Sequence, residues 1–488
     1  MLVSINPATG KPLGEAPICG PEEVAEAVRR ARAAQPAWAA RSVRDRARDI
    51  RAFRNVIIRR RMEIAEWITA EVGKPLFESL VQEILVAAEL AHFYARVAPR
   101  VLRPRRVRHR LFKQKRSWIV REPKGVVGVI TPWNYPFLLT VAPALAALVA
   151  GNTVVAKPSE HTPLIGLRIA KLFRAAGIPE DVFQVVTGDG TTGAALVAAD
   201  VDHICFTGSV RTGRRVAARC GERLVSCTLE LGGKDAAIVL EDAPLERTAA
   251  GIVWAAFANA GQVCAAIETV YAVDAIYAPL VQRLRAWIER LRIGPGTVDV
   301  DIGPMAVAFQ RDIVEDHVRD AQQRGARVIT GGVLQAEGPL YCRPRLVLDV
   351  PEDARVLTEE TFGPVLPVVR VASAEEAIAR IQASPYGLTV SIWTRDTRRA
   401  MVLARRIRVG SVYINDHLAP QGAPEVPWGG EKHSGIGRTR GIEGLLEVTY
   451  PKHIAVERWN LRRDPIWFPY HCRMLRWVHR WMPWLFRF

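Results

Sequence analysis

Three short stretches of the sequence carry side chains suited to covalent chemistry on a carbonyl group. Cys264 ends Asn-Ala-Gly-Gln-Val-Cys (259–264), Glu230 opens Glu-Leu-Gly-Gly-Lys (230–234), and Asn134 ends Thr-Pro-Trp-Asn (131–134). A thiol supplies a nucleophile, a carboxylate supplies a general base, and a side-chain amide donates hydrogen bonds to an oxyanion. The three residue types together indicate covalent catalysis on a carbonyl. A buried, unreactive thiol is the alternative for Cys264.

At these motifs the chain resembles the NAD(P)-dependent aldehyde dehydrogenases, from about Ile5 to about Val456. The resemblance implies that the Cys264 thiolate attacks an aldehyde, and that the Asn134 amide and the Cys264 backbone N–H hold the oxyanion of the resulting thiohemiacetal. Hydride transfer to the nicotinamide leaves a thioester, which water activated by Glu230 hydrolyses to a carboxylic acid. Relatives that pass the acyl group to coenzyme A generally lack this base, so Glu230 favours hydrolysis.

The segment Phe-Thr-Gly-Ser-Val-Arg-Thr-Gly (206–213) is predicted to bind the pyrophosphate of the dinucleotide. Gly208 permits a tight turn, and Ser209 can donate to phosphate or cap the helix that begins there, where free N–H groups favour an anion. In the resembled family, this Gly-Ser-x-x-x-Gly pattern, which here ends at Gly213, binds the pyrophosphate. The alternative is a helix that Ser209 simply caps, with no ligand. A second motif, Gly-Asp-Gly-Thr-Thr-Gly (188–193), follows the third strand of the alternation and is not interpreted as the dinucleotide site.

Five further residues are assigned to the cofactor. Lys157 and Glu160 follow a predicted strand where an adenine ribose is expected. A carboxylate at position 160 accepts hydrogen bonds from both ribose hydroxyls but repels a 2′-phosphate, which favours NAD over NADP. The resemblance places the nicotinamide ribose on Glu360 and the ring of Phe362 near the nicotinamide, and it includes Trp133 in the cofactor site. A position in the core is the alternative for Phe362.

Two departures from the resembled family concern the substrate. Position 269 is threonine where the family often has arginine, and Ala142-Pro143 stands where many relatives carry a bulky aromatic residue. The leading hypothesis is an NAD-dependent dehydrogenase for a hydrophobic or long-chain aldehyde. The alternatives are a semialdehyde dehydrogenase of the same fold and, from a different class of protein, a noncatalytic scaffold.

Alternating apolar strands and helices are expected to position these motifs. Strands are predicted at residues 126–130, 153–157, 183–187 and 203–207, followed by one near 236–240. With helices between them, they indicate an α/β fold with a doubly wound, Rossmann-like sheet. A second set, at 328–330, 365–371, 389–393 and 410–414, indicates an α/β catalytic lobe. The uncharged run 125–156 is long enough to span a bilayer, but Thr-Pro-Trp-Asn-Tyr-Pro interrupts it, which favours a buried strand, loop and helix.

The chain is predicted to divide into four parts. They are a cofactor-binding domain (1–102, 124–231 and 420–443), a catalytic domain (232–419), a β oligomerisation arm (103–123 and 444–457) and a C-terminal tail (458–488). Basic and apolar residues nearly alternate in the first arm segment, which indicates an exposed two-stranded ribbon. The arm's role comes from the resemblance, and it implies a homodimer or a homotetramer.

Composition restricts the class of protein. The 488 residues are 49% hydrophobic and 24% charged, which is typical of a soluble globular protein with two or three domains. The net charge of +17 suits an anionic partner, but no nucleic-acid-binding signature accompanies it, so no nucleic acid is expected. Seven cysteines form no Cys-x-x-Cys pair, and no apolar signal segment is present. These features indicate a cytoplasmic protein with free thiols and no metal site.

The tail combines aromatic and basic residues. Residues 458–488 contain five tryptophans and seven arginines. At 100° per residue, one helical face collects Met474, Trp477, Val478, Trp481, Met482 and Leu485, and the other collects Arg473, Arg476, Arg480 and Arg487. This pattern predicts a helix that lies in the interface of an anionic membrane surface, at the inner face of the membrane. Packing on the enzyme's own surface or on a partner subunit is the alternative.

Overall fold

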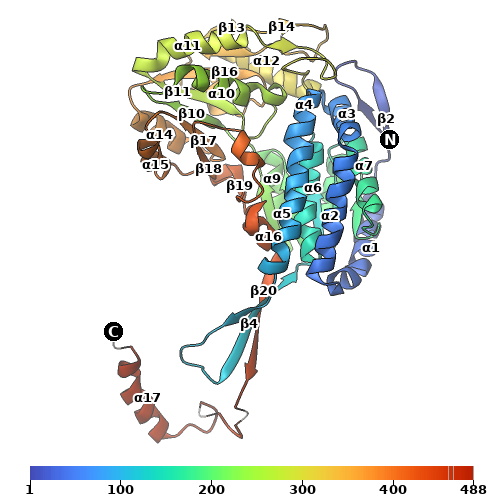
Figure 1. Cartoon of the computed structure of the whole chain (residues 1–488), viewed down its shortest axis with the longest axis vertical. Helices are drawn as coiled ribbons and strands as arrows, with labels where there is room; N and C mark the ends of the chain where they lie inside the picture. Colours follow the sequence, from blue (N-terminus) through green and yellow to red (C-terminus); the bar gives the residue numbers. More distant parts are fainter. Residues whose placement is uncertain (460, 465, 487–488) are drawn as a thin grey trace. The chain divides into compact units, whose positions relative to one another are not determined.

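The structure, a computed structural model, describes residues 1–459, 461–464 and 466–486. These residues form two compact units. The larger unit comprises Met1–Leu102 and Glu122–Tyr450, and the smaller unit comprises the described residues of Arg103–Arg121 and Pro451–Phe488. Two large sheets lie in the larger unit (Figure 1). The finer domain boundaries that the sequence suggests stay a prediction.

The first sheet carries the motifs predicted to bind the cofactor. Its strands are, in spatial order, β19 (Gly435–Ile436), β9 (Ser226–Glu230), β8 (His203–Thr207), β5 (Val126–Ile130), β6 (Thr153–Lys157) and β7 (Phe183–Val185). Adjacent strands from β9 to β7 are parallel to one another, whereas β19 pairs antiparallel with β9. The chain builds outward from β5 in both directions, which confirms the doubly wound order. Ligands of such sheets bind beyond the carboxyl ends of the strands where the order reverses.

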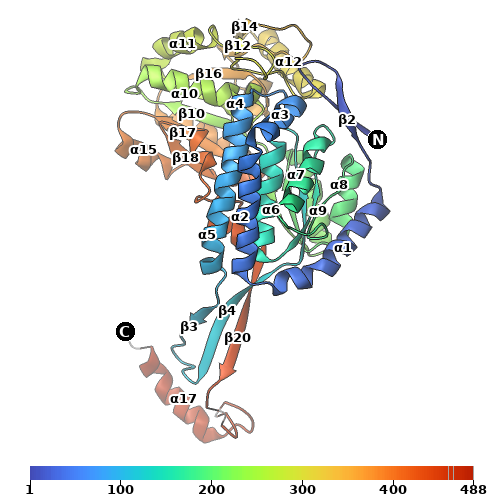
Figure 2. The ribbon, with the colours of Figure 1, turned by 45° about the vertical axis from the view of Figure 1, so that its right-hand side comes forward.

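Helices cover both faces of the first sheet. One face packs against α2 (Val43–Arg59), α5 (Val86–Val101), α6 (Pro136–Ala150) and α7 (Pro163–Ala175), and the other against α1 (Pro21–Ala40), α8 (Gly190–Ala198) and α9 (Val210–Glu222). Because successive side chains of a strand point to opposite faces, Val127 and Val129 join the first core and Val126 and Ile130 the second. Figure 2 shows α2, α5 and α6 side by side. The uncharged run of residues 125–156 is thus β5, a loop, the buried α6 and β6, as predicted.

The second sheet carries the segment that contains Cys264. Its strands are, in spatial order, β13 (Arg327–Thr330), β15 (Arg345–Leu348), β16 (Val365–Val371), β11 (Ile267–Val273), β10 (Asp235–Val239), β17 (Thr389–Trp393) and β18 (Ser411–Ile414). Its faces are covered by α10 (Leu245–Phe257), α11 (Asp274–Ile288) and α12 (Ala308–Gln323) on one side, and by α14 (Ala374–Ala383) and α15 (Thr397–Ala404) on the other. β13 is antiparallel to β15, and the other neighbouring pairs are parallel.

From Pro21 to about Ala98 the sequence predicts two or three amphipathic helices, and the structure has more than that. Between α2 and α5 lie α3 (Arg61–Val72), the short α4 (Leu76–Glu78) and a π-helical segment, η1 (Ser79–Leu85). The breaks have local causes. Ser42 caps α2 by accepting a hydrogen bond from the Asp45 N–H, and Gly73 ends α3 with a φ of 90°, in the left-handed region.

Short elements complete the larger unit. They are β1 (Leu2–Ile5), β2 (Pro12–Ala16), η2 (Ala258–Gly261), β12 (Arg292–Ile293), β14 (Val333–Leu334), α13 (Arg355–Thr358), η3 (Ala419–Gly422), η4 (Lys432–Ser434) and α16 (Gly441–Glu447).

The two segments predicted to form the arm contribute the strands of a three-stranded sheet. β20 (Thr449–Glu457), β4 (Lys115–Pro123) and β3 (Arg105–Val107) follow one another in that order. The ribbon predicted from residues 103–123 therefore has a third strand. That strand comes from the second segment that the sequence assigned to the arm.

The tail forms a helix, α17 (Cys472–Leu485), as its periodicity predicts. Trp477, Trp481 and Trp484 are exposed, and the rings of Trp481 and Trp484 lie 4.9 Å apart between centroids. Arg487, predicted on the basic face, lies outside the described residues. Among the helices of the described chain, none combines the length and the apolar character needed to cross a bilayer.

Candidate active site

A cavity of about 1060 Å³ brings most of the predicted site residues together. It opens beyond the carboxyl ends of β5, β6, β8 and β9, where a doubly wound sheet binds its ligands. Asn134, Glu230 and Cys264 all line it. So do seven of the predicted cofactor residues: Trp133, Lys157, Glu160, Gly208, Ser209, Glu360 and Phe362.

Asn134 lies in the loop after β5 and is tied to the segment of the predicted nucleophile. Its side-chain Nδ2 donates to the Gln262 carbonyl at 2.9 Å, and the Asn259 side chain donates back to the Asn134 carbonyl at 3.2 Å. The amide is buried, and its Oδ1 has no hydrogen-bond partner among the described residues. Because an amide nitrogen carries two hydrogens, one N–H of Asn134 is left for an oxyanion in the cavity.

Cys264 follows a backbone segment that is held in an unusual conformation. Asn259 and Ala260 have φ values of 50° and 56°, in the left-handed region that non-glycine residues rarely adopt. The Glu78 carboxylate accepts a hydrogen bond from the Asn259 N–H at 2.9 Å, which helps to hold this geometry. Gly261 is required next, because a Cβ there would lie 2.4 Å from the Gly363 backbone.

The electrostatic surroundings of Cys264 keep its thiol protonated. Burial raises the pKa of the thiol well above its usual value, and the nearby carboxyl groups of Glu230, Asp235 and Glu360 raise it further, whereas Arg440 lowers it. The thiol therefore needs a base before it can act as a nucleophile.

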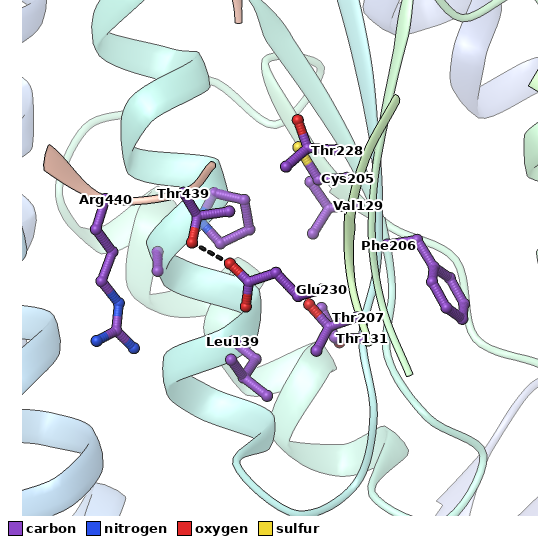
Figure 3. A pocket seen from close by; sticks show the side chains of 12 residues that line it. Val129, Thr131, Leu139, Cys205, Phe206, Thr207, Thr228, Glu230, Thr439 and Arg440 are labelled. Atoms are coloured by element: carbon purple, nitrogen blue, oxygen red, sulfur yellow. Dashed lines mark hydrogen bonds between the residues drawn. The ribbon is translucent and has the colours of Figure 1, made fainter. Parts of the chain in front are cut away.

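Glu230 ends β9 and turns its carboxylate toward the loop after β19. Its Oε2 accepts a hydrogen bond from Trp428 Nε1 at 3.1 Å, and its Oε1 accepts one from the Thr439 hydroxyl. Figure 3 shows this carboxylate beside Thr439 in a small internal pocket of about 10 Å³, which Arg440 also lines. Burial raises the pKa of Glu230, against the opposing effects of Thr439, Arg440 and Trp428. A carboxylate whose pKa is shifted toward neutrality is a stronger general base.

The phosphate-binding prediction falls on the start of α9. Ser209 caps this helix, since its hydroxyl accepts a hydrogen bond from the Thr212 N–H at 3.3 Å. A Cβ on Gly208 would lie 2.7 Å from the ring of Phe206, so only glycine fits this turn. Gly213, in contrast, does not line the cavity. A Cβ there would lie 2.4 Å from the Leu231 side chain, so Gly213 lets α9 pack closely on the segment after β9.

Lys157 and Glu160 form an ion pair in the cavity lining, where β6 ends. Lys157 Nζ lies 3.3 Å from Glu160 Oε2, and the lysine is buried while the glutamate is partly exposed. Burial raises the pKa of Glu160, but Lys157, a backbone hydrogen bond and His161 together lower it by more, so the pKa lies below its usual value and the carboxylate is ionised at neutral pH.

Glu360 and Phe362 line the cavity from the segment that precedes β16. Glu360 accepts a hydrogen bond from the Gly233 N–H at 3.2 Å, and burial together with the Glu268 carboxyl raises the pKa of Glu360 to about 8. The ring of Phe362 packs edge-to-face on Trp133, with centroids 5.6 Å apart. Phe362 lines the cavity and is not part of the buried core, so the alternative given for it is wrong.

Sequence reasoning missed two groups of cavity-lining residues. Phe309, Gln310 and Ile313 come from α12, whose sequence has no motif that marks it as part of a site. Arg211, Arg215 and Arg219 come from α9, and their spacing of four residues places them on one helical face. That spacing was available in the sequence. Thr269 lies buried in β11 and lines neither pocket, so its departure from the resembled family does not alter these cavities.

Comparison with known proteins gives a consistent result. Residues 1–454 match the Aldehyde dehydrogenase family. The 4,4′-diapolycopene aldehyde oxidase of a Methylomonas species is 38% identical over 471 residues, which cover 96% of this chain and 88% of that protein. A putative succinate-semialdehyde dehydrogenase [NADP(+)] of Mycobacterium ulcerans is 38% identical over 453 residues, which cover 92% of this chain and 87% of that protein. The structure of an NAD-dependent aldehyde dehydrogenase from Sinorhizobium meliloti superimposes with a TM-score of 0.91 at 34% identity, covering 96% and 93% of the two chains.

Proposed function

Because the chain belongs to the aldehyde dehydrogenase family, whose enzymes use NAD or NADP, we propose that it oxidises a hydrophobic aldehyde to a carboxylic acid with NAD as the preferred cofactor. One observation carries the proposal. A nucleophile, a base and an oxyanion donor line the same cavity as seven candidate cofactor residues. A noncatalytic scaffold has no need of this arrangement.

In the proposed mechanism Glu230 provides the base and Cys264 the nucleophile. The thiolate attacks the aldehyde carbon, and the free N–H of Asn134 and the backbone N–H of Cys264 stabilise the oxyanion that forms. A nicotinamide cofactor in its oxidised form would, when bound, supply the acceptor for the hydride that leaves this carbon. Glu230 passes the thiol's proton to solvent and then takes a proton from the water that attacks the thioester, and Cys264 leaves as the thiolate. Its raised pKa suits both proton transfers.

The cavity residues fit a dinucleotide. The turn at Gly208 leaves no room for a Cβ, and the N-terminus of α9 presents backbone N–H groups there. We propose that Lys157 and Glu160 hold the adenine ribose, and that Glu360, Phe362 and Trp133 contact the nicotinamide half. Glu160 favours NAD, because a 2′-phosphate next to its carboxylate would be repelled. Arg211 and Arg215, which line the same cavity, supply cations that can partly offset this repulsion, so NADP is expected as a poorer cofactor.

Two features support a hydrophobic aldehyde. The exposed aromatic face of α17 suits a lipid surface, where a lipid-derived aldehyde would be found. A relative that covers 96% of this chain is named for an aldehyde of diapolycopene.

A semialdehyde is the second candidate substrate, and one observation favours it. Arg440 is buried and lines the pocket beside Glu230, donates to the Gln421 carbonyl and lies 5.7 Å from the centre of the Trp428 ring, and within the described residues it forms no ion pair with a carboxylate. Such a cation can hold the distal carboxylate of a semialdehyde. A relative is also named as a succinate-semialdehyde dehydrogenase.

A panel of aldehydes tests the function and separates the two substrates. Purified protein is mixed with NAD or NADP, and the reduced cofactor is followed by its absorbance. A higher kcat/KM for long-chain alkanals than for succinic semialdehyde supports the first candidate, and the reverse order supports the second. Absence of turnover with every aldehyde and both cofactors would leave the scaffold as the remaining explanation.

We also propose that the β arm assembles the chain into a homodimer or homotetramer and that the tail attaches it to the inner face of an anionic membrane. β3 of the arm has exposed backbone on its outer edge, which suits pairing with another copy. Light scattering of the purified protein measures the number of subunits.

A further inference from the structure

Glu268 lies only four residues after Cys264 and has no role in the mechanism above. It stands on β11 and is almost completely buried. Its Oε2 accepts a hydrogen bond from the Thr361 N–H at 2.8 Å, and its Oε1 accepts one from the Phe362 N–H at 2.7 Å. One carboxylate therefore holds two consecutive N–H groups of the segment that lines the cofactor cavity.

Lys234 completes this arrangement from a third part of the chain. It ends the Glu-Leu-Gly-Gly-Lys stretch that begins with Glu230, and its Nζ lies 2.6 Å from Glu268 Oε2. The same ammonium donates to the Thr361 hydroxyl at 3.3 Å. A buried ion pair is tolerated only where further hydrogen bonds satisfy both charges; besides the pair itself, Glu268 accepts two such bonds and Lys234 donates one. The pair therefore joins the segments of the nucleophile, the base and the cofactor.

The segment held by this pair needs support because its backbone is strained. Phe362 has a φ of 50°, in the left-handed region that a bulky residue adopts only when its surroundings require it. Other side chains also hold Thr361: Gln310 Nε2 donates to its carbonyl at 2.9 Å, and His317 Nδ1 lies 3.2 Å from its hydroxyl. Without the carboxylate of Glu268, two buried N–H groups beside the strained residue would lose their acceptor.

We propose that Glu268 and Lys234 form a clamp that positions the segment 360–362, and the nicotinamide half of the cofactor that binds there, relative to Cys264. The proposal rests on the proposed dehydrogenase function. In the hydride step, the C–H bond of the thiohemiacetal breaks, its electron pair and hydrogen pass to the oxidised nicotinamide, and the thioester carbonyl forms. Because the rate of such a step depends on sub-ångström placement, a relaxed segment slows it. Glu268 acts as a positioning residue, since it lines neither pocket.

A matched variant elsewhere in the chain separates positioning from simple stabilisation of the fold. Glu71 is also buried and also accepts from two consecutive backbone N–H groups, those of Leu164 at 3.1 Å and Ile165 at 2.8 Å, and from the Ser4 hydroxyl at 2.6 Å. It lines neither of the two pockets. E71Q and E268Q therefore impose the same chemical change on similar carboxylates, and only E268Q touches the cofactor segment.

The expected results differ between the two variants. E268Q is expected to lower kcat at saturating NAD by about 10- to 100-fold, and to give a primary isotope effect on kcat with an aldehyde deuterated at C1, because hydride transfer becomes rate-limiting. NAD binding, measured by calorimetry, weakens in E268Q. E71Q is expected to retain the parent's kcat, isotope effect and NAD affinity while losing a similar amount of thermal stability. Equal behaviour of the two variants in kcat, isotope effect and NAD affinity would overturn the clamp.

Two further measurements keep the test decisive. If E268Q does not fold, E268D replaces it. This variant keeps a carboxylate near Lys234 but withdraws it by one methylene from Thr361 and Phe362. Its kcat, isotope effect and NAD affinity are expected to change in the same directions as in E268Q, by smaller amounts. The calorimetric result does not require turnover. If the parent protein oxidises no aldehyde, the proposed function fails, and unaltered NAD affinity in E268Q or E268D would separately overturn the clamp.

Discussion

The chemistry of the site depends on how burial and charge set the state of single side chains. Three carboxyl groups and burial raise the pKa of the Cys264 thiol, so the resting nucleophile is protonated. Burial also raises the pKa of Glu230, which makes that carboxylate a better acceptor for the thiol's proton. Both shifts arise because the cavity is enclosed, and they adapt the pair to exchange one proton.

The first residue-level prediction concerns Cys264. C264A is expected to bind NAD as tightly as the parent but to lose at least ~1,000-fold in turnover, because no other group on the cavity can form the thioester. Calorimetry measures the binding, and cofactor absorbance measures the turnover. C342A serves as a control, since Cys342 is buried outside the cavity lining and its removal leaves the chemistry intact. Turnover of C264A near the parent rate would exclude Cys264 as the nucleophile.

Glu230 is predicted to act in deacylation. E230Q is expected to release one equivalent of reduced cofactor in a burst that is slower than the parent's first turnover, because the thiol lacks its base, and then to turn over ~100- to 10,000-fold more slowly, because the thioester also lacks it. The parent's deacylation rate should rise with pH through the raised pKa of Glu230, since the ionised carboxylate is the active form, and this rise should be absent in E230Q. Undiminished steady-state turnover in E230Q would show that another group activates the water.

Sequence reasoning identified cavity-lining residues that stand in local motifs and missed residues whose contacts depend on packing between distant segments. Asn134, Glu230 and Cys264 each stand beside glycine, proline or small residues that mark a turn near a site. Glu268 has no such signature, because its partners Thr361 and Phe362 lie more than ninety positions away. Gly213 shows the opposite case, in which a motif glycine is required by helix packing.

At the scale of elements, the strands were easier to predict than the helices. β5, β6, β8, β16 and β17 have the bounds that their apolar runs indicate, because parallel strands buried on both faces are continuously apolar. β7 is two residues shorter than predicted, ending at Val185. The N-terminal helices were undercounted because Ser42 and Gly73 interrupt an otherwise continuous helical periodicity.

The turn after β6, which carries Glu160, and the helix α9 are predicted to determine cofactor preference together. E160S is expected to raise the ratio of kcat/KM for NADP to that for NAD by about tenfold, equivalent to ~1.4 kcal/mol, because a repulsive charge is removed. R215Q is expected to lower the same ratio. R214Q provides a control on the same helix, since Arg214 lies outside the cavity lining. A parent enzyme that already prefers NADP would contradict the role given to Glu160.

At the scale of the whole molecule, the tail adds a property that the catalytic unit does not need. The residues of α17 are mostly exposed, and its sequence separates tryptophans from arginines around the helix. Within the smaller unit, Arg110 donates to the Leu485 carbonyl and its guanidinium lies 5.4 Å from the centre of the Phe486 ring. These contacts join a basic strand-connecting loop to the end of the helix. They therefore place two candidate membrane-binding signals in one unit, and stable attachment usually requires two.

The last prediction tests this attachment by flotation with liposomes. The full-length protein is expected to float with vesicles that contain anionic lipid, and a version ending at Leu461 is not. Arg473, Arg476 and Arg480 should each contribute about 1 kcal/mol near an anionic surface, so replacing all three with glutamine should weaken binding by ~100-fold and remove most of its salt dependence. That variant keeps every tryptophan and so separates charge from aromatic insertion. Equal failure of the full-length and shortened proteins to float would identify α17 as a contact within the protein or its assembly. It would also remove the main support for a lipid-derived substrate, and the buried Arg440 would then make a semialdehyde the better candidate.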